Sequence, residues 1–176
     1  MKYFLINHNK NTNKMKKLAL ILTGGIFLVS LVALTAFKIL PPRPSANGQG
    51  TLTLPYLNGT QHFSFHAQTD ASNNVTGSFE TKSPGQDIRV HGNIDCLNVL
   101  ADGKTAVMTG LVTQVTGEGF PIAVGDRIWF KVQDNGEGAN SPADKFSDYF
   151  VFGGSCNSNF IVTMNAITGG NIQVKP

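Results

Sequence analysis

From residue 50 onward, apolar and polar side chains alternate with a period of two, as in β-strands, rather than with the period of 3.6 that marks a helix. In QHFSFHAQ, for example, Phe63 and Phe65 alternate with His62, Ser64 and His66. Turn-forming pairs such as Asn-Gly and Asp-Gly separate the alternating runs. We therefore expect about eight strands, at residues 50–56, 61–68, 74–82, 87–100, 104–115, 126–134, 147–152 and 160–175, the last interrupted at Gly169-Gly170.

These strands indicate an all-β domain at residues 48–176, because no window combines helical periodicity with capping residues. Their close spacing along the chain favours a single antiparallel meander that closes as a barrel or a sandwich. The apolar positions of the pattern predict the core, which we expect to contain Leu52, Leu54, Phe63, Phe65, Val75, Phe79, Val90, Ile94, Val107, Leu111, Ile128, Phe130, Val132, Phe150, Phe152, Phe160 and Val162.

A separate apolar segment precedes this domain. Residues 18–37 contain no charged side chain, and lysines flank them on both sides. A helix of this length rises ~30 Å, enough to span a bilayer, so residues 1–38 are expected to form a signal peptide or a signal-anchor helix. No small-x-small cleavage site follows at once, so cleavage and retention both stay open, as do Met1 and Met15 as the start. Either alternative exports the rest of the chain, which begins with a proline-rich spacer at 39–47.

Charge is divided unevenly along the chain, whose net charge is +3. Residues 1–46 carry seven basic side chains and no acidic one, whereas residues 47–176 carry seven basic and eleven acidic side chains and so sum to −4. The domain has no basic stripe to displace counterions from phosphates, which excludes a nucleic-acid-binding protein. With 14% charged and 41% hydrophobic residues, the composition also excludes a disordered chain.

A series of glycines and aromatic residues runs through the domain. It comprises Gly48-Gln49-Gly50, Phe63-Ser64-Phe65, Gly77-Ser78-Phe79, Ile94-Asp95-Cys96-Leu97, Ala106-Val107-Met108-Thr109-Gly110, the run from Phe130 to Gly138 with its acidic turn, and the run from Gly169 to Val174. Over residues 48–176 this series resembles exported bacterial β-domains of the post-COAP-1 type. The resemblance implies a bacterial, exported β-domain and carries over no catalytic residue.

The two cysteines, Cys96 and Cys156, both fall in the part of the chain that is expected to be exported. In an oxidising compartment we expect them to pair, and the loop-entropy model gives about 4 kcal/mol of stabilisation for a span of this length. Two buried free thiols are the alternative, since Cys96 lies in an apolar strand. The sequence contains no Cys-x-x-Cys motif of the kind that redox proteins use.

His62, Ser64 and His66 share one face of an expected strand, and His91 lies two strands further on. Imidazoles bind zinc or copper, but His62 and His66 are roughly 13 Å apart at ~3.3 Å per residue, which is too far for one ion. A triad of Ser64, His91 and an aspartate is a second interpretation, although Ser64 lies on no nucleophile turn. The third is a solvated strand face, with Phe63 facing the core.

The segment DNGEGANSPADKFSD (134–148) is the best candidate for metal binding. Five of its side chains are candidate oxygen ligands: Asp134, Glu137, Asn140, Asp144 and Asp148. Calcium takes six to eight oxygen ligands, often from a flexible loop, although the spacing here departs from the EF-hand pattern. A weak calcium site and a solvated hairpin loop both stay open.

Trp129 and Lys131 alternate with Ile128 and Phe130 and therefore face away from the predicted core. An outward tryptophan contacts a sugar or protein ligand in some proteins and packs beneath a neighbouring loop in others. The sequence leaves both alternatives open for Trp129.

The sequence contains no nucleophile elbow, no paired catalytic carboxylates and no metal-ligand spacing, so we expect a non-enzymatic protein by elimination. Its role would be binding or structural, at the bacterial cell envelope or in the medium, with an envelope or extracellular partner that the sequence does not identify. Membrane contact is expected only through residues 18–37, if they are retained. The alternative is a small β-barrel ligand carrier or enzyme with an interior site near His62, Ser64, His66 and His91.

Overall fold

The computed structural model describes residues 42–54, 59–117, 121–138, 140–151 and 153–176. These residues form strands β1 (Ser45–Leu54), β2 (Gly59–Thr69), β3 (Val75–Ser83), β4 (Ile88–Val99), β5 (Thr105–Thr116), β6 (Arg127–Gln133), β7 (Lys145–Phe146), β8 (Phe150–Val151), β9 (Asn165–Ala166) and β10 (Gly169–Lys175), with a 3₁₀ turn, η1 (Pro84–Gln86), before β4. The described part contains no α-helix. All strands belong to one antiparallel sheet that is curled into a half-barrel, which confirms the all-β prediction.

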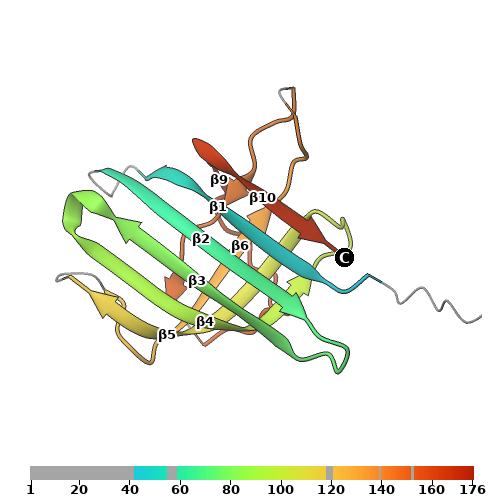
Figure 1. The fold of residues 1–176 in the computed structure, drawn as a ribbon, viewed down its shortest axis with the longest axis horizontal. Coiled ribbons are helices and arrows are strands. Elements are labelled where there is room, and N and C mark those ends of the chain that lie inside the picture. Colours follow the sequence, from blue (N-terminus) through green and yellow to red (C-terminus); the bar gives the residue numbers. More distant parts are fainter. Residues whose placement is uncertain (1–41, 55–58, 118–120, 139, 152) are drawn as a thin grey trace, which may run out of the picture. The chain divides into compact units, whose positions relative to one another are not determined.

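Strands β1 to β6 form the expected meander, because each pairs antiparallel with its successor in the chain. The order across the sheet is β10-β1-β2-β3-β4-β5-β6-β7-β9, and β8 also pairs with β6. Strand β10 departs from the meander, since it returns to the start of the domain and pairs with β1. In Figure 1, β10, β1, β2, β3 and β4 lie side by side as one layer, with β6 behind them.

Strand boundaries differ from the prediction at both ends of the domain. Strand β1 begins at Ser45, within the expected spacer, because residues 45–47 pair with β2 on one side and with β10 on the other. Within the expected strand 160–175, only β9 and β10 form strands, and within the expected strand 147–152 only β8 does. Apolar residues alternate in an extended loop much as they do in a strand, so only the pairing partners distinguish the two.

Six aromatic rings fill the interior of the half-barrel, and they belong to Phe63, Phe65, Phe79, Phe130, Phe146 and Tyr149. Neighbouring rings lie with their centroids 4.3 to 6.3 Å apart, the distance at which aromatic side chains pack in contact. Aliphatic side chains surround them, including the predicted core residues Leu52, Val90, Ile94, Ile128 and Val132. The alternation in β2 therefore places its phenylalanines inside, as expected.

The core prediction is wrong for Leu111 and Phe160, whose exposed fractions are 42% and 43%. In β5 the even positions, such as Met108 and Val112, join the interior, while Val107 is buried in a second cluster on the other face. The run TAVMTG is apolar at successive positions, so its period does not reveal which face points inward. Phe152 and the side chain of Leu54 lie outside the described residues.

Candidate functional site

The outer surface of β10, β1, β2, β3 and β4 is polar across all five strands. Cross-strand pairing aligns Asn171, Gln49, Ser64, Glu80 and His91 in one row and Gln173, Asn47, His66 and Ser78 in the next. The side chains of each row point away from the aromatic interior, because their neighbours along the strands, such as Phe63, Phe65 and Phe79, point into it. We call these nine residues the polar face.

A shallow depression of about 500 Å³ lies on the polar face and is lined by all nine residues. Ser64, one of the two shortest side chains, lies in the middle of the first row between Gln49 and Glu80, and Ser78, the other, lies at the end of the second row beside His66. A second depression of about 440 Å³ shares Gln49, Ser64 and Glu80 with the first and continues past His62 and Lys82 to Thr51. Together the two depressions form a groove, which we call the polar groove.

The structure separates the residues of the predicted triad and of the predicted histidine site. Ser64 pairs across strands with Glu80, and Glu80 in turn pairs with His91, so a carboxylate-bearing strand lies between Ser64 and His91. His66 Nδ1 is instead 3.2 Å from Ser78 Oγ, and His91 Nδ1 is 3.2 Å from Thr113 Oγ1.

His62, Ser64 and His66 are exposed, and His91 is half-buried on the same outer surface. The interior location considered for these four side chains is therefore wrong. The third interpretation, a solvated strand face, matches where they lie.

Glu80 is the one carboxylate that lines the polar groove, and two cations, Lys82 and Arg89, pair with it. Its Oε2 accepts hydrogen bonds from Arg89 Nε at 3.1 Å and Nη2 at 2.5 Å, and its Oε1 is 3.1 Å from Lys82 Nζ. The hydrogen bonds from the Arg89 side chain, with a smaller contribution from Lys82, hold the pKa of Glu80 below its usual value. Glu80 therefore remains ionised near neutral pH but adds no uncompensated charge to the groove.

Two carboxylates of the 134–148 loop bind the edge of β10 that faces away from β1. Asp144 Oδ2 accepts the backbone N–H of Ile172 at 2.7 Å, and Asp134 Oδ2 accepts that of Val174 at 3.1 Å. The other oxygen of Asp144 accepts the N–H of Asn135 at 2.8 Å. These carboxylates thus replace a neighbouring strand as hydrogen-bond acceptors for β10.

The remaining candidate calcium ligands are dispersed. Glu137 Oε1 accepts the amide hydrogens of Asn171 and Gln173 at 2.9 and 3.2 Å, and these bonds lower the pKa of Glu137. Asn140 is exposed, and burial raises the pKa of Asp148, which lies beyond β7. Among the residues that the structure describes, no three His, Cys, Asp or Glu side chains are grouped so that they could hold a metal ion.

Melting in millimolar calcium against melting in a chelator tests the calcium prediction. A site would raise the melting temperature by about 5–10 °C at a hundredfold excess over Kd. We expect no shift, because Asp134 and Asp144 already accept backbone hydrogens. A calcium-dependent rise that Asp134→Ala abolishes would establish the site instead.

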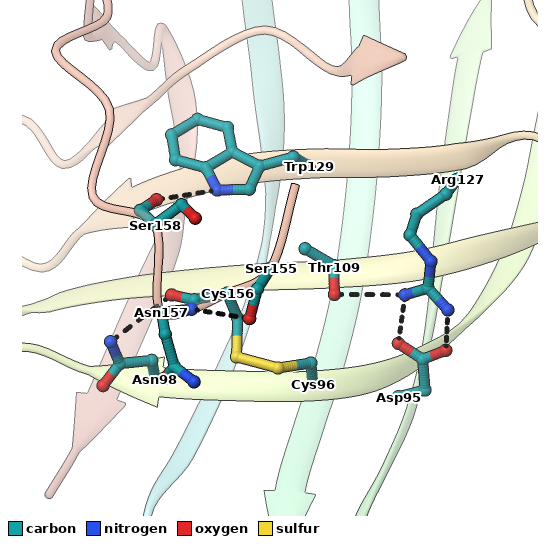
Figure 2. The surroundings of a disulfide bond; sticks show 10 residues. All are labelled: Asp95, Cys96, Asn98, Thr109, Arg127, Trp129, Ser155, Cys156, Asn157 and Ser158. Atoms are coloured by element: carbon teal, nitrogen blue, oxygen red, sulfur yellow. Dashed lines mark hydrogen bonds and ion pairs between the residues drawn. A yellow bond between two sulfur atoms is a disulfide. The ribbon is translucent and has the colours of Figure 1, made fainter. Parts of the chain in front are cut away.

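A disulfide joins Cys96 of β4 to Cys156, across a sequence separation of 60 residues, which confirms the expected pairing. Figure 2 shows this bond on the outer surface of β4 and β5, with the loop that carries Cys156 lying over the sheet. Asn98 Nδ2 donates to the carbonyl of Cys156 at 3.3 Å and adds a second link between loop and strand. Nearby, Arg127 forms a two-pronged ion pair with Asp95, which raises the pKa of Arg127.

Trp129 lies beneath this loop and is fully buried. Its Nε1 donates to the carbonyl of Ser158 at 3.1 Å, and its ring packs edge-on against Phe150 and Phe160 (Figure 2 shows the Ser158 contact). Lys131 Nζ lies 5.6 Å from the ring centre, and burial lowers the pKa of Lys131. Of the two alternatives for the outward tryptophan, packing beneath a loop is the one found.

The sequence did not single out the amides of β1 and β10, although they make up much of the polar face. Asn47 and Gln49 alternate with small inward residues, and Asn171 and Gln173 alternate with Ile172 and Val174. The alternation in NIQVK is a sequence signal that could have found two of them. Asn47 falls in the expected spacer at 39–47, because Gly48 and Gly50 interrupt the apolar-polar alternation there.

Searches against family models, curated proteins and solved structures found no match to this chain. The similarity to the post-COAP-1 group therefore stays an expectation. The predicted signal or anchor at residues 1–38 lies outside the described residues. Among the residues that are described, no helix has the length and apolar character needed to cross a membrane.

Proposed function

We propose that this chain is a non-enzymatic, exported β-domain that acts in binding, or as a structural module, at the bacterial cell envelope or in the medium. One observation carries the binding role: aromatic rings fill the interior, and the polar groups that could contact a ligand lie outside, on a sheet backed by that core. The disulfide is in keeping with an oxidising, extracytoplasmic location.

A ligand carrier or enzyme with an interior site is the second candidate. It is favoured by two buried polar atoms, Gln61 Oε1 and Tyr149 Oη, that have no hydrogen-bond partner among the described residues. Against it, the rings of Phe63, Phe79 and Phe146 occupy the centre where a ligand would lie. A β-barrel holds a ligand only if its interior is wider than the space that the barrel's inward side chains fill.

Export is tested by fusing residues 1–41, which precede the described domain, to a reporter that is active only outside the cytoplasm. We expect activity, because a basic segment followed by 20 apolar residues directs a chain to the membrane. A matched fusion with two of the apolar leucines replaced by arginine should be inactive. Cytoplasmic retention of the unaltered fusion would refute the proposed location.

A further inference from the structure

We propose that the polar groove binds a neutral polysaccharide chain. This inference rests on the proposed binding function and names its ligand class. The groove is defined by its two adjoining depressions, and its central residues are Gln49, Ser64 and Glu80.

The charge of the groove favours an uncharged ligand. Its lining contains one carboxylate, Glu80, and one ammonium group, Lys82, whose charged atoms are 3.1 Å apart. Arg89 also pairs with Glu80, so one positive charge is in surplus, shared by two side chains that bind the same carboxylate. A cationic polymer would need uncompensated carboxylates, and an anionic one would need several free basic groups along its length. The lining offers neither.

The groove also provides the hydrogen-bonding groups that hydroxyls require. The amides of Asn47 and Gln49 present both donors and an acceptor, and Ser64 presents a hydroxyl that donates and accepts. The amides of Asn171 and Gln173 each donate one hydrogen to Glu137 and keep their other hydrogen and their oxygen. The side chains of Asn47, Gln49 and Ser64 form no hydrogen bond with other described residues, so they are available to a ligand. A sugar hydroxyl, which both donates and accepts, matches this set.

The same lining is unsuited to a protein partner. Protein interfaces depend on aromatic and aliphatic anchors that enter apolar pockets. The apolar side chains in the lining, Phe63 and Phe65, belong to the interior and are 4% and 5% exposed. The exposed apolar side chains of the described domain, including Val124 and Ile161, do not line the groove.

The groove is held rigid before any ligand arrives. Its side chains stand on paired strands, and the aromatic core lies directly beneath β2 and β3. At the rim, Glu137 Oε1 accepts hydrogens from both Asn171 and Gln173 and so restricts two of the amides. Preorganised side chains lose less conformational entropy on binding, which offsets the weakness of single hydroxyl contacts.

The length of the groove favours a chain over a single sugar. His66, Ser64 and His62 follow it along β2, and they span roughly 13 Å at ~3.3 Å per residue. Several sugar rings in succession could therefore occupy the groove, and each would add its own contacts.

The test is affinity electrophoresis of the exported protein in gels that contain dextran, laminarin, galactomannan or a chito-oligosaccharide conjugate. We expect at least one neutral glycan to retard the protein. Its affinity should change less than twofold between 50 and 500 mM NaCl, because salt screens interactions between charges (roughly 8 Å Debye length at physiological salt) and a neutral glycan carries none. Ser64→Phe, which places a ring on the groove floor, should weaken binding at least tenfold. Gln49→Ala, which removes an exposed amide without adding bulk, should weaken it severalfold.

Gln68→Phe is the matched control, because Gln68 lies on the same face of β2 but outside both depressions. It should bind as the unaltered protein does, and melting curves should show all three variants folded. Retardation by none of the glycans overturns the inference, as does equal binding by Ser64→Phe and Gln68→Phe. If isolated envelopes nevertheless retain the protein through another surface, the proposed binding function stands and only its glycan ligand is refuted.

Discussion

Replacing Asp144 by alanine is expected to lower the free energy of unfolding by about 3–5 kcal/mol, since two backbone N–H groups would lose their acceptor at ~1–3 kcal/mol each. Asp144 is 5% exposed, and its carboxylate accepts the N–H groups of Asn135 and Ile172 at 2.8 and 2.7 Å. Alanine offers the buried N–H of Ile172 and the half-buried N–H of Asn135 no oxygen in place of the carboxylate. Urea unfolding followed by circular dichroism measures the loss.

Glu137→Ala is the control in the same loop. Glu137 is exposed and contacts β10 only through the side chains of Asn171 and Gln173, so the urea midpoint should change little. Asp144→Asn keeps the volume and one acceptor oxygen, and we expect it to fall between the two. Equal midpoints for Asp144→Ala and Glu137→Ala would show that Asp144 does not hold β10 in place.

Removing the disulfide, by Cys96→Ser with Cys156→Ser, should lower the free energy of unfolding by about 4 kcal/mol, because the unfolded chain regains the freedom of a long closed loop. The loop that carries Cys156 also covers Trp129, and Ser158 accepts the hydrogen of its indole. Loosening the loop should therefore admit water to the indole and shift its fluorescence to longer wavelength in the folded state.

Reductant provides the matched control for the disulfide. It should destabilise the unaltered protein by a similar amount and leave the double serine variant unchanged, because that variant has no bond to reduce. A midpoint that reductant does not move in the unaltered protein would mean that the cross-link adds nothing to stability.

The part of the domain between β6 and β10 has little strand pairing of its own. Strands β7, β8 and β9 contribute two residues each, whereas β10 has seven and pairs with β1. The disulfide attaches the loop between β8 and β9 to β4, and the carboxylates of Asp134 and Asp144 attach β10 to the loop that follows β6. Covalent and side-chain links thus take the place of long paired strands between β6 and β10.

Much of the fold could be predicted from the sequence, because the alternation that identifies a strand and its inward face lies within a few consecutive residues. The alternation of Phe63 and Phe65 with polar neighbours identified both a strand and its inward face, and the structure confirms each. The same alternation placed Trp129 on the opposite side from Phe130. Strand periodicity depends on where one residue points relative to the next, which the chain order alone determines.

The candidate site was predictable only in part. The outward orientation of His62, Ser64 and His66 was among the alternatives, since it follows from the period of β2. The amides of β1 and β10 joined them only because residues 169–175 return to pair with residues 45–51, more than a hundred positions earlier. A pairing between such distant segments leaves little trace in the pattern of either segment.

Tertiary structure alone decided the role of the acidic loop at 134–148 and whether the side chains of Leu111 and Trp129 are exposed or buried. The sequence showed a cluster of oxygen side chains after β6, but the acceptor role of Asp134 and Asp144 depends on where β10 lies. Leu111 and Trp129 both face outward from the sheet, yet one is 42% exposed and the other fully buried. The difference is the loop that the disulfide holds over Trp129, and such coverage depends on three-dimensional proximity rather than on the order of residues.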